Sequence, residues 1–521
     1  MQTHTDEAPV YAVMELSFRG PTLRAIDTPA RDVDFWVRFQ HESGTPTYTV
    51  HGFWDGDGKG GVAGDSFKVR FCPTTPGKWT LVEVFSNAAS LSGQRQGETV
   101  TAVPSHHPGF WLVDSNTPDS RWYMRSDESH PYIFGNTHYS FLSGYRQGNV
   151  PAGNDIAADI RANAAYFKKL RFSLYGDHYP NPDEKPFQGD AGKPTDWGNY
   201  AYRPNPRWFH RRVDLAVQTA YDVDLIADLI LAGPDREESR SALRGGAEPF
   251  LKYIAARYGS FPNVWICLCN EFDIKAQTYT EAEIARFGQT IRQYLPYPTP
   301  LSVHATPRKA WSAEFDSLPP WNDHQIIQNK LRQLGPAADA IYNAALKPDG
   351  ASRNRPTIND ELSYQGEGDG HTEGDTIESH LGAFLGGGYA TTGWKPGNKT
   401  GHYFWGKFDT AEHTAAVHLG WLREMIDGHM TFWKMSPDVS IFSNLDSGFR
   451  GMAWPGREYV LGTNKRHAGI VANLPDGEWH VTQYDVMTRR ATTLATEAQG
   501  RFAFDAPEGR AVLFHFKRDG D

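Results

Sequence analysis

The sequence has 521 residues, a length that predicts two or three domains. It contains 52 Lys and Arg against 62 Asp and Glu, a formal net charge of −10, and no basic stripe, which argues against nucleic acid as a partner. Aromatic residues make up 13% of the chain, a content that serves both large cores and sugar-stacking surfaces.

Signals for export, membrane insertion and metal binding are weak. The first residues lack a basic start followed by an apolar run, so a cytoplasmic protein is expected, although a secreted protein trimmed at its N-terminus would look the same. No stretch of about 18 apolar residues occurs, so no membrane partner is expected. The three cysteines, Cys72, Cys267 and Cys269, fit neither a disulfide framework nor a zinc cluster, and no cofactor is expected.

Residues 1–105 are predicted to form a β-sandwich. Segments 35–39 and 47–53 alternate between apolar and polar residues, and turn signals such as 55–61 recur about every ten residues. Packing is the simplest role for this domain, and sugar binding is the alternative.

Residues 106–430 show strands that alternate with amphipathic helices, the pattern of a parallel α/β fold. The predicted strands are 132–137, 171–176, 224–231, 264–269, 301–305, 324–329, 356–362 and 389–394. Eight strand–helix units favour a (β/α)8 TIM barrel. A doubly wound sheet is the alternative, but no Gly-rich phosphate loop follows the first strand.

Residues 431–521 return to short strands, such as 458–462 and 479–484, separated by turns. A second, smaller β-sandwich is therefore predicted. The expected fold class is α/β, with a TIM barrel flanked by N-terminal and C-terminal β-sandwich domains.

Two glutamates close predicted barrel strands. The run 264–269 is apolar on both faces, as in a buried parallel strand, and ends in Asn270-Glu271, while Glu361 closes the seventh strand. Barrel enzymes place catalytic groups at the carboxyl ends of their strands. Two carboxylates at this position are the groups that glycoside hydrolysis uses. The configuration of the anomeric carbon is retained if the carboxyl groups lie about 5–5.5 Å apart and inverted if they lie about 6.5–9.5 Å apart. An exposed strand-end acid without a catalytic role is the alternative for Glu271.

These residues resemble a large clan of retaining glycosidases on (β/α)8 barrels. The resemblance implies that Glu271 is the acid/base and Glu361 the nucleophile. It also implies that Asn270 contacts the sugar hydroxyl beside the reacting carbon.

The whole layout resembles bacterial proteins with an N-terminal domain of unknown function, an apiosidase-like barrel and a small C-terminal β domain that carries a collagen-binding label in some members. Segments 35–39, 52–56 and 75–79 carry the N-terminal likeness, and 134–138 and 386–393 carry the barrel likeness. The resemblance implies an oligosaccharide or glycan substrate and suggests a furanoside such as apiose, arabinofuranose or galactofuranose. Members are often exported, and the missing signal peptide favours short imported oligosaccharides here.

Several polar side chains are expected on the same rim of the barrel. His138, His178 and His304 each follow or close a predicted strand and are interpreted as hydrogen-bond partners of the sugar or of a catalytic glutamate. A three-histidine zinc site and a structural role are the alternatives, but no metal-binding spacing supports zinc. Asp177 ends the second strand and could bind a sugar hydroxyl.

Aromatic residues follow the eighth strand. Trp394, Tyr403 and Trp405 are expected to form a sugar-stacking platform. Asp360, beside Glu361, should point the other way on an extended strand and is interpreted as structural.

The predicted function is a retaining, exo-acting glycoside hydrolase that removes a terminal sugar, with a furanoside favoured. The alternatives are a pyranoside-specific exo-glycosidase, a carbohydrate-binding protein on a barrel without activity, and a metal-dependent hydrolase. The linkage, the anomer and the oligomeric state stay open, and a homo-oligomer is compatible with the sequence.

Overall fold

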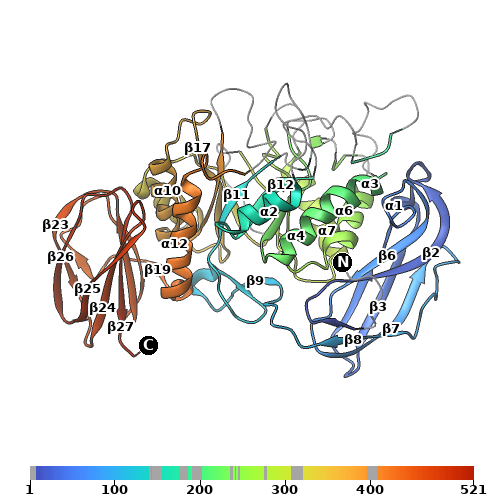
Figure 1. Cartoon of the computed structure of the whole chain (residues 1–521), viewed down its shortest axis with the longest axis horizontal. Helices are drawn as coiled ribbons and strands as arrows, with labels where there is room; N and C mark the ends of the chain where they lie inside the picture. The colour runs from blue at the N-terminus through green and yellow to red at the C-terminus, as the bar shows by residue number, and fades with distance from the viewer. Residues whose placement is uncertain are drawn as a thin grey trace.

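The computed structural model describes residues 7–139, 142, 155–174, 186–189, 202–234, 239–240, 242–244, 247–274, 279–306, 321–395 and 408–520. Three parts lie in a row, with a parallel barrel in the middle and separate β-sheets at each end (Figure 1). This arrangement confirms the predicted fold class, a barrel flanked by two β domains.

The N-terminal part consists of two sheets that enclose one apolar core. One sheet has the order β1-β8-β7-β3-β4 and the other β2-β6-β5. Their strands are β1 (Glu7–Pro9), β2 (Met14–Arg24), β3 (Phe35–His41), β4 (Thr47–His51), β5 (Phe53–Trp54), β6 (Ala63–Phe71), β7 (Gly77–Ser86) and β8 (Thr99–Val103), and the short helix α1 (Pro29–Asp32) precedes β3. Burial alternates along β3, where Phe35, Val37 and Phe39 are fully buried, as period two requires.

The central sheet has eight parallel strands in the order β15-β14-β13-β12-β11-β18-β17-β16. They are β11 (Phe134–Thr137), β12 (Lys169–Ser173), β13 (Ile226–Ile230), β14 (Val264–Cys267), β15 (Leu301–Ser302), β16 (Gln325–Ile327), β17 (Thr357–Gln365) and β18 (Tyr389–Trp394). This is the strand order of a (β/α)8 barrel, with β15 and β16 at the two ends of the ladder.

Helices surround the barrel (Figure 1). They are α2 (Ile156–Ala164), α3 (Pro206–Trp208), α4 (Asp214–Asp222), α6 (Ala247–Tyr258), α7 (Glu281–Tyr294), α9 (Leu334–Ala344), α10 (Glu373–Leu385) and α12 (Ala415–His429). Capping boxes begin α7 at Thr280 and α10 at Thr372, where each threonine accepts a bond from the third residue of its helix. None of the helices in the described ranges is long and apolar enough to cross a bilayer.

A hairpin that sequence analysis did not predict covers the amino ends of the barrel strands. It consists of β9 (Trp111–Val113) and β10 (Tyr123–Arg125). The rings of Trp111 and Tyr123 lie 6.0 and 4.6 Å from that of Trp265, and Tyr123 Oη bonds His324 Nδ1 at 2.8 Å. Because this end is plugged by aromatic rings, access to the barrel interior is left to the carboxyl end.

The C-terminal part is a second pair of antiparallel sheets, in the orders β19-β21-β22-β27-β24-β25 and β20-β23-β26. The strands are β19 (Ser436–Pro437), β20 (Phe442–Ser443), β21 (Arg450–Trp454), β22 (Glu458–Thr463), β23 (His467–Asn473), β24 (Trp479–Asp485), β25 (Arg490–Ala498), β26 (Arg501–Ala506) and β27 (Val512–Arg518). Arg450 bonds Asp339 of α9 at 2.7 Å, and Arg510 bonds Asp375 of α10 at 2.7 Å.

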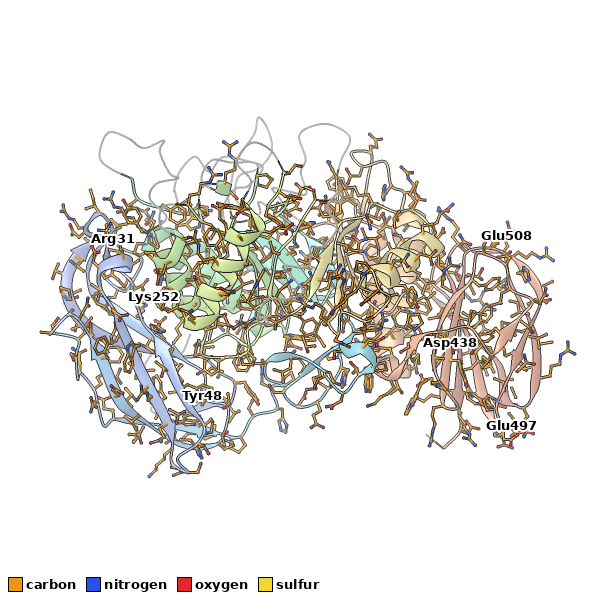
Figure 2. The ribbon with its side chains drawn as sticks, turned by 180° about the vertical axis from the view of Figure 1, so that it is seen from behind. Arg31, Tyr48, Lys252, Asp438, Glu497 and Glu508 are labelled. Carbon is orange, nitrogen blue, oxygen red and sulfur yellow. The ribbon has the colours of Figure 1, made fainter. Side chains whose placement is uncertain are left out.

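Buried ion pairs join the N-terminal sheets to the barrel. Arg70 of β6 and Arg257 of α6 both bind the carboxylate of Asp214 in α4, with nitrogen–oxygen distances of 2.6–3.1 Å. Lys252 of α6 lies on the side of the barrel that faces these sheets and pairs with Asp34 (Figure 2). Bidentate pairs of this kind fix the orientation of one part on the other.

Candidate active site

Glu271 is positioned by hydrogen bonds that extend the parallel ladder beyond the end of β14. Asn270 N donates to Ala232 O at 2.8 Å on one side, and Phe272 N donates to His304 O at 3.0 Å on the other. Glu271 itself has a φ of +43°, a left-handed conformation that is strained for a residue with a side chain. The chain therefore turns at Glu271, which places its carboxylate at the carboxyl end of the barrel.

Glu361 lies inside β17, where the register against β18 shifts between Asn359 and Ser363. Such a bulge breaks the strict alternation of side chains. Asp360 and Glu361 both approach Arg171 as a result, at 3.9 and 3.8 Å. The prediction that Asp360 points away from the site was wrong because it assumed a regular strand, whereas its interpretation as a structural residue agrees with the buried ion pair it makes with Lys169.

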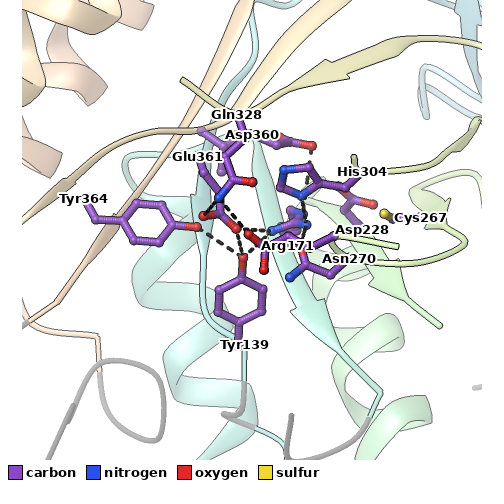
Figure 3. A network of polar contacts seen from close by, with 12 residues as sticks. Tyr139, Arg171, Asp228, Cys267, Asn270, His304, Gln328, Asp360, Glu361 and Tyr364 are labelled. Atoms are coloured by element: carbon purple, nitrogen blue, oxygen red, sulfur yellow. Dashed lines mark hydrogen bonds and ion pairs between the residues drawn. The ribbon is translucent and has the colours of Figure 1, made fainter. Parts of the chain in front are cut away.

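One amide nitrogen joins the two glutamates. Gln328, which follows β16, donates from Nε2 to Glu271 Oε1 at 3.0 Å. The same nitrogen donates to Glu361 Oε2 at 2.8 Å (Figure 3). Because both oxygens contact the same atom, at 3.0 and 2.8 Å, they lie no more than about 6 Å apart.

Arg171 of β12 is the centre of the remaining polar contacts (Figure 3). Its Nη1 donates to Tyr139 Oη at 2.8 Å, and Tyr139 Oη in turn donates to Glu361 Oε1. Its Nη2 donates to Asn270 Oδ1 and, at 2.6 Å, to His304 Nδ1. Since arginine only donates, Nδ1 of His304 must be unprotonated.

Burial and charge set the protonation of this cluster. Burial raises the pKa of Glu361 to about 7, with Arg171 opposing the shift and the Glu271 carboxylate adding to it. Burial also raises the pKa of Tyr139, which keeps its hydroxyl a donor. Burial and then the Arg171 charge hold the pKa of His304 well below its usual value, so its imidazole is neutral.

A second layer of charges lies beneath the site. Lys169, Asp228 and Asp360 are completely buried, and Lys169 Nζ pairs with both carboxylates. Burial alone would raise the pKa of Asp360, but Lys169 and Arg171 outweigh it and lower that pKa. Thr391 Oγ1 also donates to Asp360 at 2.5 Å.

The structure places six of the predicted site residues. Glu271, Glu361, Asn270 and His304 are joined in one network through Arg171 and Gln328. His138 is fully buried just after β11, and Trp394 is half-buried at the end of β18. The predicted residues Asp177, His178, Tyr403 and Trp405 lie outside the described residues.

Sequence analysis missed Arg171, Tyr139 and Gln328. A signal existed for Arg171, because charged residues at 169 and 171 share one face of a strand that is buried throughout. No such signal marks Gln328, an amide just after a short strand. Among the residues that the structure describes, no group of three or more His, Cys, Asp or Glu side chains could hold a metal ion.

Family comparisons agree with this layout. Residues 163–380 match a family model described as "Apiosidase-like, catalytic domain", and residues 7–85 match a domain of unknown function, DUF5060. No curated protein matches the chain. The stretch from β12 to β17 is therefore similar to an apiosidase-like catalytic domain.

Solved structures show the same fold. A candidate glycoside hydrolase from Bacteroides vulgatus aligns over 99% of this chain and 100% of its own, with a TM-score of 0.76 and 20% identity. A glycoside hydrolase family 5 protein from Bacteroides vulgatus aligns over 80% of this chain and 94% of its own, with a TM-score of 0.60 and 12% identity. At such identities the likeness concerns the fold alone.

Proposed function

We propose that this protein is a retaining exo-glycosidase that removes a terminal furanoside sugar from an oligosaccharide or glycan. The observation that carries the proposal is the bridge from Gln328 Nε2 to both Glu271 and Glu361. It holds one oxygen of each carboxyl group within about 6 Å of the other, which supports the short carboxyl separation of a retaining enzyme.

In the proposed reaction, Glu361 attacks the anomeric carbon while Glu271 gives its proton to the leaving oxygen. The bond from the anomeric carbon to the leaving oxygen breaks, and a glycosyl ester forms on Glu361. Glu271 then takes a proton from water, the water oxygen attacks the same carbon, and the ester bond breaks. Asn270 is proposed to contact the hydroxyl beside the reacting carbon.

Two properties of Glu361 bear on its role in opposite directions. Tyr139 and Arg171 both stabilise negative charge on it, as a nucleophile requires. Its raised pKa of about 7 is instead the property of a general acid. We assign Glu361 as nucleophile because two donors, Tyr139 and Arg171, approach its carboxylate, whereas burial, the largest cause of the raised pKa, would act on it in either role.

The sugar class is proposed from the apiosidase-like family match, which supports a furanoside substrate. His304 and His138 are proposed to contact the sugar, and Trp394 is proposed to stack on it. A pyranoside-specific exo-glycosidase is the nearest alternative and would use the same two glutamates.

The test is a screen of the wild type and Glu361→Gln on nitrophenyl furanosides and pyranosides, followed by chromatography of products from natural oligosaccharides. Release of a single monosaccharide by the wild type and its loss in the variant would support the proposal. If the wild type cleaves only pyranosides, the substrate is a pyranoside and not a furanoside. If the products are larger than one sugar, the enzyme is endo-acting.

A second measurement tests the roles of the two glutamates. Glu271→Ala should retain more activity on substrates with activated leaving groups than on natural ones, because such groups need little protonation. If Glu361→Ala spares the activated substrates instead, the two roles are reversed. Azide as an external nucleophile adds a check, because only the variant that lacks the acid/base should form a glycosyl azide of retained configuration.

A further inference from the structure

We propose that Gln328 is a positioning residue that sets the separation of Glu271 and Glu361 and divides its hydrogen bonding between them during the reaction. The proposal rests on the proposed glycosidase function and deepens it. It assigns a task to a residue that neither the sequence pattern nor the family matches mark.

Both hydrogens of the Gln328 amide nitrogen are used in hydrogen bonds. An amide nitrogen carries two hydrogens, and one points to each glutamate, at 3.0 and 2.8 Å. The nitrogen must face the carboxylates, because the amide oxygen can only accept and would meet two further acceptors there. A donor to Glu361 favours its ionised form, which a nucleophile needs.

The backbone around Gln328 is fixed to the strand that carries Glu361. Asn329 N donates to Asn359 Oδ1 at 3.2 Å, and Asn359 Nδ2 donates back to Asn329 O at 3.0 Å. Leu331 N also donates to Leu362 O at 3.0 Å. These bonds follow Gln328 in the chain, and the pairing of Ile327 with Asn359 in the parallel ladder precedes it. Because its side chain is also buried, its reach to Glu361 is set by two packed strands.

The bridge responds to the charge of each glutamate as the reaction proceeds. When Glu361 forms the glycosyl ester, its negative charge is lost and it becomes a weaker acceptor. Glu271 has by then given its proton to the leaving oxygen and is the only anionic acceptor of the amide. The hydrogen bond from Gln328 Nε2 to Glu271 therefore stabilises the Glu271 carboxylate until that carboxylate takes a proton from water.

The test uses Gln328→Met, which keeps the length of the side chain and removes the donor, and Gln328→Glu, which keeps the shape and adds a third carboxylate. For Gln328→Met we expect kcat/KM to fall about 100-fold, the size of effect that a displacement of about 1 Å produces. Both limbs of the pH profile of kcat/KM should move to higher pH by about one unit, since two carboxylates lose a donor. Gln328→Glu should move both limbs further, because it adds a third carboxylate beside the two glutamates.

A matched control is Gln325→Met, which changes a buried glutamine at the first residue of β16, the strand that Gln328 follows. It should leave both pH limbs where they are. If Gln328 only fills space, Gln328→Met would match this control and Gln328→Glu would show no larger shift than Gln328→Met, and the proposal would be overturned.

Crystal structures of the wild type and Gln328→Met separate this proposal from the proposed function. The distance between the carboxyl groups of Glu271 and Glu361 should increase in the variant. If the wild type cleaves no glycoside but the distance increases, the glycosidase proposal fails and the positioning role of Gln328 holds. An unchanged distance in an active enzyme overturns the positioning role alone.

Discussion

Asp360 and Glu361 are consecutive residues of β17, and each carboxylate is almost completely withdrawn from water. Asp360 faces Lys169 in the lower layer of the barrel, and its pKa lies below the usual value. Glu361 faces Tyr139, Gln328 and the outer part of Arg171 in the upper layer, and its pKa rises to about 7.

The difference shows that burial by itself does not decide the protonation of a carboxyl group. Burial opposes ionisation of both carboxyl groups, and the charges of Lys169 and Arg171 reverse the outcome only at Asp360. In the lower layer, Lys169 lies between Asp228 and Asp360, and all three side chains are buried. The upper layer leaves a carboxylate whose charge is incompletely compensated, which is what a reacting group requires.

The largest effect is expected for Lys169→Met. The variant leaves Asp228 and Asp360 buried without their cation, so the free energy of unfolding should fall by about 3–5 kcal/mol. Denaturant titration followed by circular dichroism measures this loss. Lys168→Met is the matched control, because its partner Asp224 is partly exposed, and its loss should be smaller. Equal losses would show that the lower layer is no more important than a surface pair.

A smaller effect, with a clear pH dependence, is expected for the stability of Glu361→Gln. A carboxyl group whose pKa rises from 4.5 to about 7 on folding costs nothing below pH 4.5 and its full penalty above pH 7. That penalty is about 3 kcal/mol and is absent from the variant. The stability of the variant relative to the wild type should therefore increase between pH 4.5 and 7, as melting curves across this range would show.

Glu367→Gln supplies the control for this prediction, since Glu367 is an exposed residue of the following loop. Its stability relative to the wild type should not change with pH. If the stability difference between Glu361→Gln and the wild type also stays constant with pH, the raised pKa of Glu361 is contradicted. The contrast between the two layers would then be lost.

The smallest effect is expected for Tyr139→Phe. The variant removes a hydrogen bond to the charged form of Glu361, so the acidic limb of kcat/KM should move up by about one pH unit. Tyr132→Phe, which removes a buried hydroxyl bonded to Gly388 O at 2.7 Å, should leave the limb in place. A limb that also stays in place for Tyr139→Phe would mean that another group controls the acid side of the profile.

Local patterns in the sequence were sufficient for the architecture. Strands alternating with amphipathic helices predicted eight parallel strands, and the described residues contain eight. The position of Asn270-Glu271 just after an apolar run placed that pair at the carboxyl end of β14, where the structure has it. These inferences depend on the period of the chain within one element, which the sequence displays directly.

Only the tertiary structure decided the chemistry of the site. The bulge in β17 turned both Asp360 and Glu361 toward Arg171, against the regular alternation of a strand. Gln328 joined two glutamates that are 90 residues apart in sequence, and neither fact follows from a local pattern. The physical reason is that a pKa and a carboxyl separation depend on side chains from several strands, and their spacing is fixed only when the barrel packs.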